Sequence, residues 1–181
     1  MNTPTTLREH PRFSADFERL RAVTLNPARH TAPNAHAHSL WVASRAGELA
    51  ILHDCTPDEA STLEALGLVH DIGKIHGTTA PAKSVELLPD YGIDDPRFID
   101  LVRYHDVNLP WHIATTRGEP PTDKAWRKLA SRVDVFLLSV FMLADRVDCP
   151  GGVHANPPLA WFLDEVTRRG LLTRPLHPDA W

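Results

Sequence analysis

The sequence predicts an all-α protein of about six to eight helices, and three observations support this class. Apolar residues recur every three to four positions in several windows, which is the spacing of one helix face. No window of useful length alternates apolar and polar residues as a half-buried strand would. The 16 prolines fall between the periodic segments, where they end helices. With 181 residues, we expect a single domain over residues 1–181.

The first half of the chain has one strong helix start. Thr56 can cap a helix, Pro57 suits its first turn, and Glu59 completes a capping box. Around it, apolar periodicity and breaker residues predict, in order, a loosely packed segment 1–11, a short helix over residues 14–25, a loop over 27–35, a helix over 37–53, the capped helix ending at His70-Asp71, a loop over 74–81 and a short helix over 83–88.

The second half is divided by prolines and glycines. Pro96 opens a helix that runs to about His105, and Pro110 is expected to stop further helix. Thr122 can cap the next helix. The remaining predictions are a loop over 117–121, a helix from Thr122 that continues or kinks into residues 136–147, and a last helix over 159–169 packed on the rest.

Composition excludes several classes of protein. The net charge of -4 gives no broad basic surface, which argues against strong nonspecific binding to nucleic acid. Cys55 and Cys149 form no CxxC pair, and we expect both to be reduced. The N-terminus has no apolar stretch typical of a signal peptide, and no apolar run reaches membrane-spanning length. We therefore expect a cytoplasmic protein without a membrane partner.

The sharpest local motif is the pentapeptide HDIGK at residues 70–74. His70 offers an imidazole nitrogen and Asp71 a carboxylate oxygen, a donor mixture that suits Mn, Fe, Co, Ni or Zn better than Mg or Ca. Neighbouring residues share a metal most easily at a helix end, which Gly73 is placed to provide. Alone, the pair is weak, since a histidine near the negative end of a helix dipole needs no metal.

Two further residues give the motif its context. His38 opens an amphipathic segment upstream, and Asp145 ends a strongly apolar segment downstream, where a buried carboxylate needs a partner. The order of His38, His70-Asp71 and Asp145 resembles the HD superfamily of metal-dependent phosphohydrolases, with its H…HD…D pattern. The resemblance covers about residues 36–148.

The HD resemblance implies a compact helical bundle whose divalent transition metal is held by His38, His70, Asp71 and Asp145. His36 competes for the first place, but the apolar spacing after His38 resembles the family's first helix more closely. His36 is then expected to be a loop or pocket-edge residue.

The resemblance also implies roles around the metal. Asp71, Lys74 and His105 are the expected catalytic residues, and Lys74, His105 and Arg146 are expected to contact the substrate phosphate. Each has a plainer alternative: Lys74 as an exposed loop lysine, His105 as a half-buried helix-end histidine, and Arg146 as half of a surface salt bridge. A metal there would lower the pKa of bound water towards about 7, giving a nucleophile at neutral pH.

The implied activity is hydrolysis of a phosphate ester by metal-activated water. The expected partner is a small phosphorylated substrate of nucleotide or RNA-end type, since residues 102–111 resemble HD modules joined to RNA-end enzymes. Lys74 departs from HD 5′-nucleotidases, which usually carry an acidic residue there. Three alternatives stay open: a di-iron oxygenase that recruits His105 and His112, a catalytically silent binding or regulatory module, and a metal-free structural bundle. The sequence leaves the oligomeric state undetermined.

Overall fold

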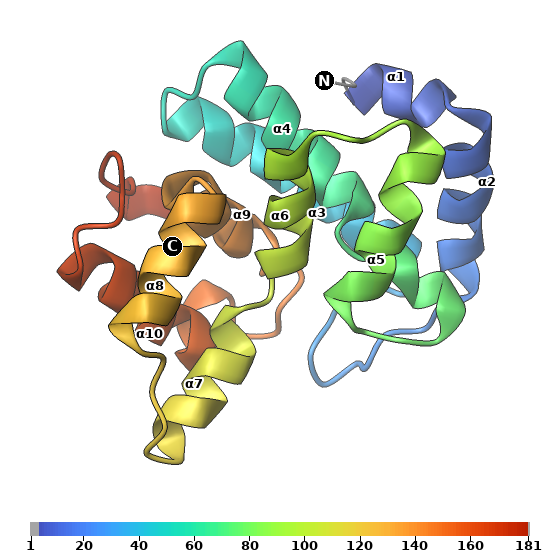
Figure 1. Cartoon of the computed structure of the whole chain (residues 1–181). Coiled ribbons are helices and arrows are strands. Elements are labelled where there is room, and N and C mark those ends of the chain that lie inside the picture. Colours follow the sequence, from blue (N-terminus) through green and yellow to red (C-terminus); the bar gives the residue numbers. More distant parts are fainter. Residues whose placement is uncertain (1–3, 181) are drawn as a thin grey trace.

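The computed structural model describes residues 4–180, and this part of the chain is helical and contains no strand (Figure 1). It has ten α-helices, more than the six to eight expected, joined by 3-10 turns and short loops. The all-α class is confirmed, and none of these helices is long and apolar enough to cross a membrane. The helices are α1 Pro4–Glu9, α2 Pro11–Arg19, α3 Ala35–Leu52, α4 Pro57–Val69, α5 Pro81–Leu87, α6 Pro96–Tyr104, α7 Asn108–Thr116, α8 Asp123–Arg132, α9 Val135–Ala144 and α10 Pro157–Arg168.

Two of the additional helices arise where the sequence predicted loop. Residues 1–11 were expected to be loosely packed, yet α1 forms there and its Leu7 is buried in the core; residues 1–3 lie outside the described part. Pro110 was expected to stop helix formation, yet it lies inside α7. Pro110 is the third residue of α7, within the first turn, where backbone N–H groups have no helical acceptor, so its missing N–H removes no helical bond.

The predicted caps largely hold. Thr56 and Glu59 make the reciprocal capping box of α4. Thr122 accepts a hydrogen bond from the backbone of Ala125 at the start of α8. The segment that was expected to continue or kink is broken at Val133, which is extended, and Asp134 caps α9 with bonds to two backbone N–H groups.

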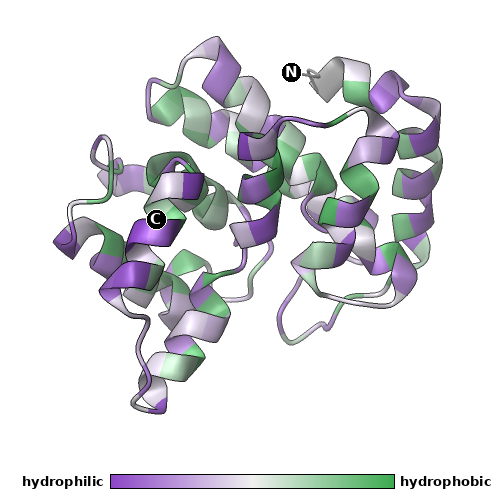
Figure 2. Ribbon diagram, in the orientation of Figure 1, coloured by the Kyte–Doolittle hydropathy of each residue, from purple (hydrophilic) through white to green (hydrophobic). Residues whose placement is uncertain are grey.

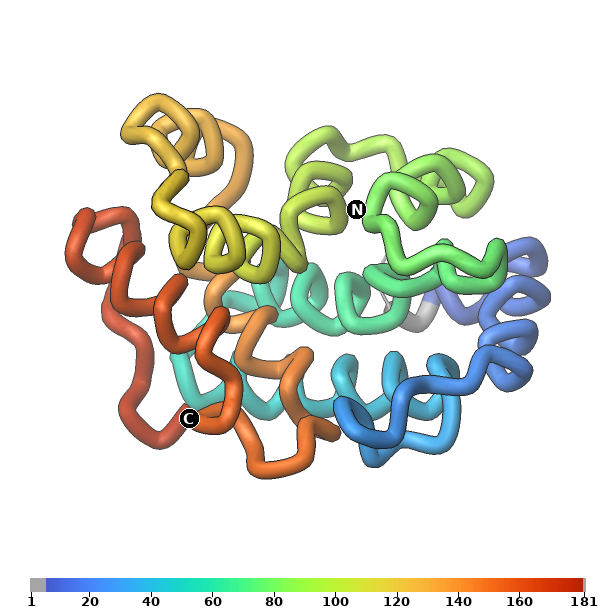
Figure 3. Tube along the Cα trace, turned by 90° about the horizontal axis from the view of Figure 1, so that it is seen from below, coloured from blue at the N-terminus to red at the C-terminus, as the bar shows by residue number. Residues whose placement is uncertain are grey.

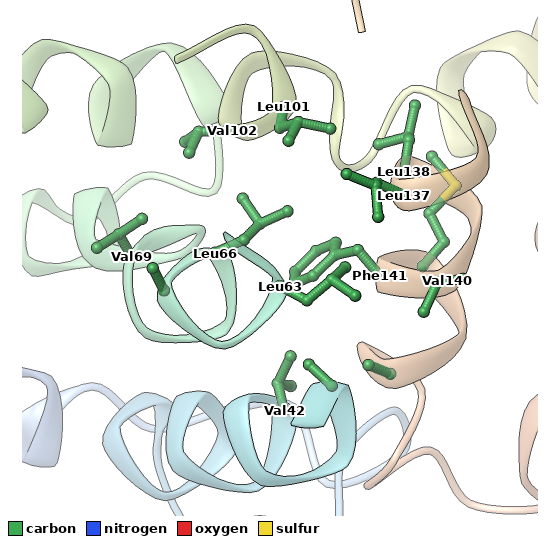
Figure 4. Close-up of a cluster of buried hydrophobic side chains, with 14 of the residues drawn as sticks. Val42, Leu63, Leu66, Val69, Leu101, Val102, Leu137, Leu138, Val140 and Phe141 are labelled. Atoms are coloured by element: carbon green, nitrogen blue, oxygen red, sulfur yellow. The ribbon is translucent and has the colours of Figure 1, made fainter. Parts of the chain in front are cut away.

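Helix α9 lies within the hydrophobic core. All ten of its residues are buried, and in Figure 2 α9 itself has the hydrophobic colour whereas α8 in front of it is mainly polar. Figure 4 shows α4 with side chains from three neighbouring helices around it. The labelled side chains belong to α3 (Val42), α4 (Leu63, Leu66, Val69), α6 (Leu101, Val102) and α9 (Leu137, Leu138, Val140, Phe141).

Helices α3 and α4 form a hairpin and lie side by side along their lengths (Figure 3). Their backbones approach closely at Gly67, where an added Cβ would lie 2.5 Å from the Cα of Ala43. Because the hairpin is antiparallel, the beginning of α3 meets the end of α4. His38 and His70 lie at these two ends.

Candidate metal centre

Four buried side chains converge where three helices end. His38 is in the first turn of α3, His70 follows the last residue of α4, Asp71 begins the next 3-10 turn, and Asp145 follows the last residue of α9. Each is less than a tenth exposed. The helix end at the HD pair, expected from Gly73, is present, and a Cβ on Gly73 would lie 2.5 Å from the backbone nitrogen of Ser84.

The donor atoms of these residues face one another. The Nε2 atoms of His38 and His70 are 3.2 Å apart. Asp71 Oδ2 lies 3.3 Å from His70 Nε2 and 3.7 Å from His38 Nε2. Asp145 Oδ1 lies 3.1 Å from His38 Nε2 and 3.3 Å from His70 Nε2. Each of the two nitrogens therefore lies close to one oxygen of each carboxylate.

These separations fit a transition metal. Ligands at 2.0–2.2 Å from a tetrahedral ion lie about 3.4 Å from one another, close to the separations found here. His38, His70 and Asp71 form a group that can hold an ion, and Asp145 adds a fourth donor. The mixed nitrogen and oxygen set suits Mn, Fe, Co, Ni or Zn rather than Mg or Ca.

The backbone fixes the orientation of the His70 ring. His70 Nδ1 lies 3.0 Å from the carbonyl oxygen of Gly67, one turn earlier in α4. A carbonyl can only accept, so Nδ1 carries a proton, and Nε2 is the nitrogen that can give up its proton and bind a metal. The residue that allows α3 to approach α4 therefore also orients a ligand, as the outer partners of metal-bound histidines commonly do.

The two imidazoles are strongly perturbed by the carboxylates around them. Burial lowers the pKa of His38, but Asp145 and Asp148 outweigh it and raise the pKa above its usual value. Burial likewise opposes protonation of His70, yet Asp71 and Asp145 raise its pKa to about 10. The cluster thus favours positive charge at its centre, which is the preference that a bound cation would satisfy.

Two cations pair with the carboxylates from the outer side. Burial disfavours ionised Asp71, but His70 and Lys74 hold its pKa well below the usual range. Burial is likewise outweighed at Asp145, whose pKa Arg146 and the imidazoles lower. Lys74 Nζ contacts Asp71 Oδ2, and Arg146 Nη2 lies 2.5 Å from Asp145 Oδ2. Both cations are largely buried. Lys74 is therefore not an exposed loop lysine, and Arg146 is not half of a surface ion pair.

His105 lies beside the cluster rather than in it. Its ring centroid is 5.1 Å from that of His70, and its Nδ1 lies 2.7 Å from the carbonyl oxygen of Val102. Burial and the charge of His70 lower the pKa of His105. The ring is therefore neutral at pH 7, with its lone pair on Nε2. It is buried just after the end of α6 rather than half-buried.

A cavity of about 400 Å³ opens over these residues. Its wall combines the four donors with cationic side chains and a few apolar ones. Arg29, of the loop before α3, has an exposed side chain and no carboxylate partner among the described residues. The lining includes His30, Lys74, His105, Asp106 and Arg146 near the donors, and Val23, Leu25 and Leu109 farther out.

Two histidines weighed from the sequence lie elsewhere. His36 is not in a loop: it is buried in α3, 3.4 Å from Glu18, with its ring 4.6 Å from that of Phe17, outside the cavity lining. His112 lies against Trp161, with ring centroids 5.7 Å apart. It is not in the cavity lining, so the pair of extra histidines needed by a di-iron site is not assembled.

Three residues that line or support the site carry no recognisable signal in the sequence. Arg29 and His30 come from the loop that precedes α3, where no periodicity assigns a direction to a side chain. Asp148 belongs to no motif that the sequence analysis singled out, yet its carboxylate is buried between His30 and His38. His30, four residues before the Asn34 cap of α3, is not distinctive in the sequence on its own.

Comparison with protein families finds the HD domain, matched to residues 36–148. The matched span includes all four donors and reaches from the start of α3 to the turn after α9. Searches of curated proteins and of solved structures found no significant match. Because the family match covers more than half of the sequence, the chain belongs to the HD-domain family.

Proposed function

We propose that this protein is a metal-dependent hydrolase of a small phosphate ester. The observation that carries the proposal is the convergence of His38, His70, Asp71 and Asp145 at the base of a cavity with cationic walls. A bound divalent transition metal would supply activated water at neutral pH and offset charge on the phosphate. The described residues show no competing arrangement at this cavity, such as a serine or cysteine nucleophile in its lining.

Lys74 and Arg146 are the residues proposed to bind phosphate oxygens. Each already lies against a ligand carboxylate at the wall of the cavity. A fixed cation in a partly dehydrated site interacts strongly with developing negative charge, because few waters screen it. Arg29 lies farther out with no carboxylate partner among the described residues, so it is available to an anionic group of the substrate.

His105 is proposed to act on a proton of the reacting water or hydroxyl group. Its neutral ring has a lone pair on Nε2, and its orientation is fixed by the carbonyl of Val102. Asp71, by contrast, has a pKa well below the usual range. It is a poor proton acceptor and a good permanent ligand, so its proposed role is to hold the metal.

The cavity supports a nucleotide or RNA-end phosphate as the substrate class. A volume of about 400 Å³ is within the range that accommodates drug-sized ligands. The apolar side chains of Val23, Leu25 and Leu109 can contact a base or sugar while the cations hold phosphate. The net charge of -4 argues against binding along a polymer backbone, which favours a free nucleotide or a chain end.

The proposal is tested by phosphate release from a panel of substrates. The protein is loaded with Mn²⁺ or Co²⁺ and given 5′- and 3′-nucleoside monophosphates, 2′,3′-cyclic nucleotides and short RNAs with a terminal phosphate. We expect hydrolysis of at least one class, with loss of activity in Lys74→Gln and in metal-free protein. Metal binding without hydrolysis of any of these would instead favour a silent regulatory module.

A further inference from the structure

One buried carboxylate beside the metal centre has two imidazole neighbours. Asp148 follows α9 and its side chain is 1% exposed. Its Oδ2 lies 3.1 Å from His30 Nδ1, and its Oδ1 lies 3.2 Å from His38 Nδ1. The rings of His30 and His38 are perpendicular, with centroids 5.0 Å apart. Asp148 thus lies behind a candidate ligand and behind a histidine of the cavity wall.

The backbone of Asp148 also holds the loop that carries His30. The backbone N–H of Thr31 donates to the carbonyl oxygen of Asp148 over 2.8 Å, and the Thr31 hydroxyl donates to the same oxygen over 3.2 Å. These bonds join the loop before α3 to the turn after α9, which are 117 residues apart in the chain. The position of His30 is therefore set by Asp148 through both backbone and side chain.

We propose that Asp148 is a positioning residue that orients two imidazoles at once: His38 toward the metal, and His30 toward the substrate. The substrate half rests on the proposed function, whereas the metal half does not. Within each ring, Nδ1 faces Asp148, so Nε2 is the nitrogen left to bind. His38 Nε2 is at the donor cluster, and His30 lines the cavity.

Asp148 can orient both rings because its carboxylate only accepts hydrogen bonds. An ionised carboxylate accepts hydrogen bonds and cannot donate them, so each Nδ1 must carry a proton and each lone pair must lie on Nε2. Carboxylates behind metal-bound histidines commonly contribute a factor of about 10 to 100 in metal affinity. The Nδ1–H of His38 is not aligned for a full hydrogen bond with Asp148, so we expect the lower end of that range.

The same three residues have a second reading. His30, His38 and Asp148 can themselves hold an ion. Such an ion would require His38 to bind through both nitrogens and to lose both protons, although a carboxylate beside Nδ1 favours a proton there. The two readings differ in stoichiometry, which is one metal per chain for positioning and two for a second site.

Cobalt binding separates these readings. Co²⁺ affinity is measured by competition with a chelator, and the visible absorption of bound Co²⁺ reports its coordination. We expect Asp148→Asn, whose amide can donate toward one ring, to weaken Co²⁺ binding about tenfold and to alter the spectrum. If the Asp148→Asn variant does not fold, Asp148→Ser is measured in its place. His36→Gln is the matched control, because it changes a buried α3 histidine paired with Glu18 outside the cavity.

His30→Gln tests the other half of the proposal. It should leave Co²⁺ affinity within about twofold of wild type while weakening the competition of inorganic phosphate for the cobalt-loaded site, or raising KM if a substrate is known. Unchanged cobalt affinity and spectrum in the folded Asp148 variant would overturn the proposal. Two Co²⁺ per wild-type chain, with one lost in His30→Gln, would also overturn it. Absence of hydrolysis in wild type would refute the proposed function without affecting the cobalt result.

Discussion

Replacement of Gly67 by alanine tests how the α3–α4 contact sets the metal centre. An added Cβ would lie 2.5 Å from the Cα of Ala43, 2.6 Å from its backbone nitrogen and 3.0 Å from its Cβ. Carbon atoms in good contact are about 3.5–4.0 Å apart, so the two backbones must separate by about 1 Å. No flexible side chain can absorb the overlap, since the nearest atoms belong to the backbone.

The overlap is close to both imidazoles. His70 is three residues beyond Gly67 and binds its carbonyl, and His38 is five residues before Ala43, about 7.5 Å along the helix axis. Metal–ligand distances tolerate errors of about 0.2 Å, so a 1 Å separation removes the fit. We expect Gly67→Ala to weaken Co²⁺ binding more than tenfold. Overpacking costs about 1–3 kcal/mol and the better helix propensity of alanine offsets about 1 kcal/mol, so the free energy of unfolding should fall by up to about 2 kcal/mol.

Gly47→Ala is the matched control for this experiment. It also replaces a glycine of the α3–α4 hairpin, but its Cβ would meet only the end of the flexible Glu64 side chain, at 3.0 Å. Its unfolding free energy should stay level or rise by up to about 1 kcal/mol, with unchanged cobalt affinity. Denaturant unfolding and chelator competition measure both quantities. Wild-type cobalt affinity in Gly67→Ala would refute the argument that this close approach fixes the ligands.

Three other outcomes are expected. Thr56→Ala removes the α4 capping box and should lower the free energy of unfolding by about 1 kcal/mol in denaturant titrations, with unchanged metal affinity; a loss of metal would contradict the separation of cap and site. Arg29→Gln should raise KM severalfold in steady-state assays with little change in kcat, and an unchanged KM would remove Arg29 from the substrate contacts. Free Co²⁺ at 100 times its Kd should raise unfolding free energy by about 2.7 kcal/mol, and an unchanged melting temperature would argue against a site specific to the folded state.

Local signals predicted the parts of the fold that depend on neighbouring residues. The capping box at Thr56 and the cap at Thr122 are short-range chemistry, and both are present. Pro110 misled the prediction because the cost of proline depends on its place in a helix, and the start of α7 was not visible from sequence. Leu7 orders α1 by packing into the core, a tertiary effect that local pattern does not contain.

The metal donors could be predicted from the sequence, whereas the residues behind them could not. His38, His70, Asp71 and Asp145 were inferred from a sequence order that a known family shares, and the structure brings their donor atoms together. His30 and Asp148 meet only because the loop before α3 and the turn after α9 are neighbours in space. No sequence spacing encodes that meeting, so these residues required the structure.

Whether the four donors form a metal centre is decided by the metal content of purified protein reconstituted with Mn²⁺, Co²⁺ or Zn²⁺, compared between wild type and Asp71→Ala. The variant removes a donor that lies 3.3 Å from His70 Nε2. Elemental analysis should find about one ion per wild-type chain, and much less in the folded variant. Equal metal content in the two proteins, or none in wild type after reconstitution, would contradict the assignment of this cluster as a metal centre.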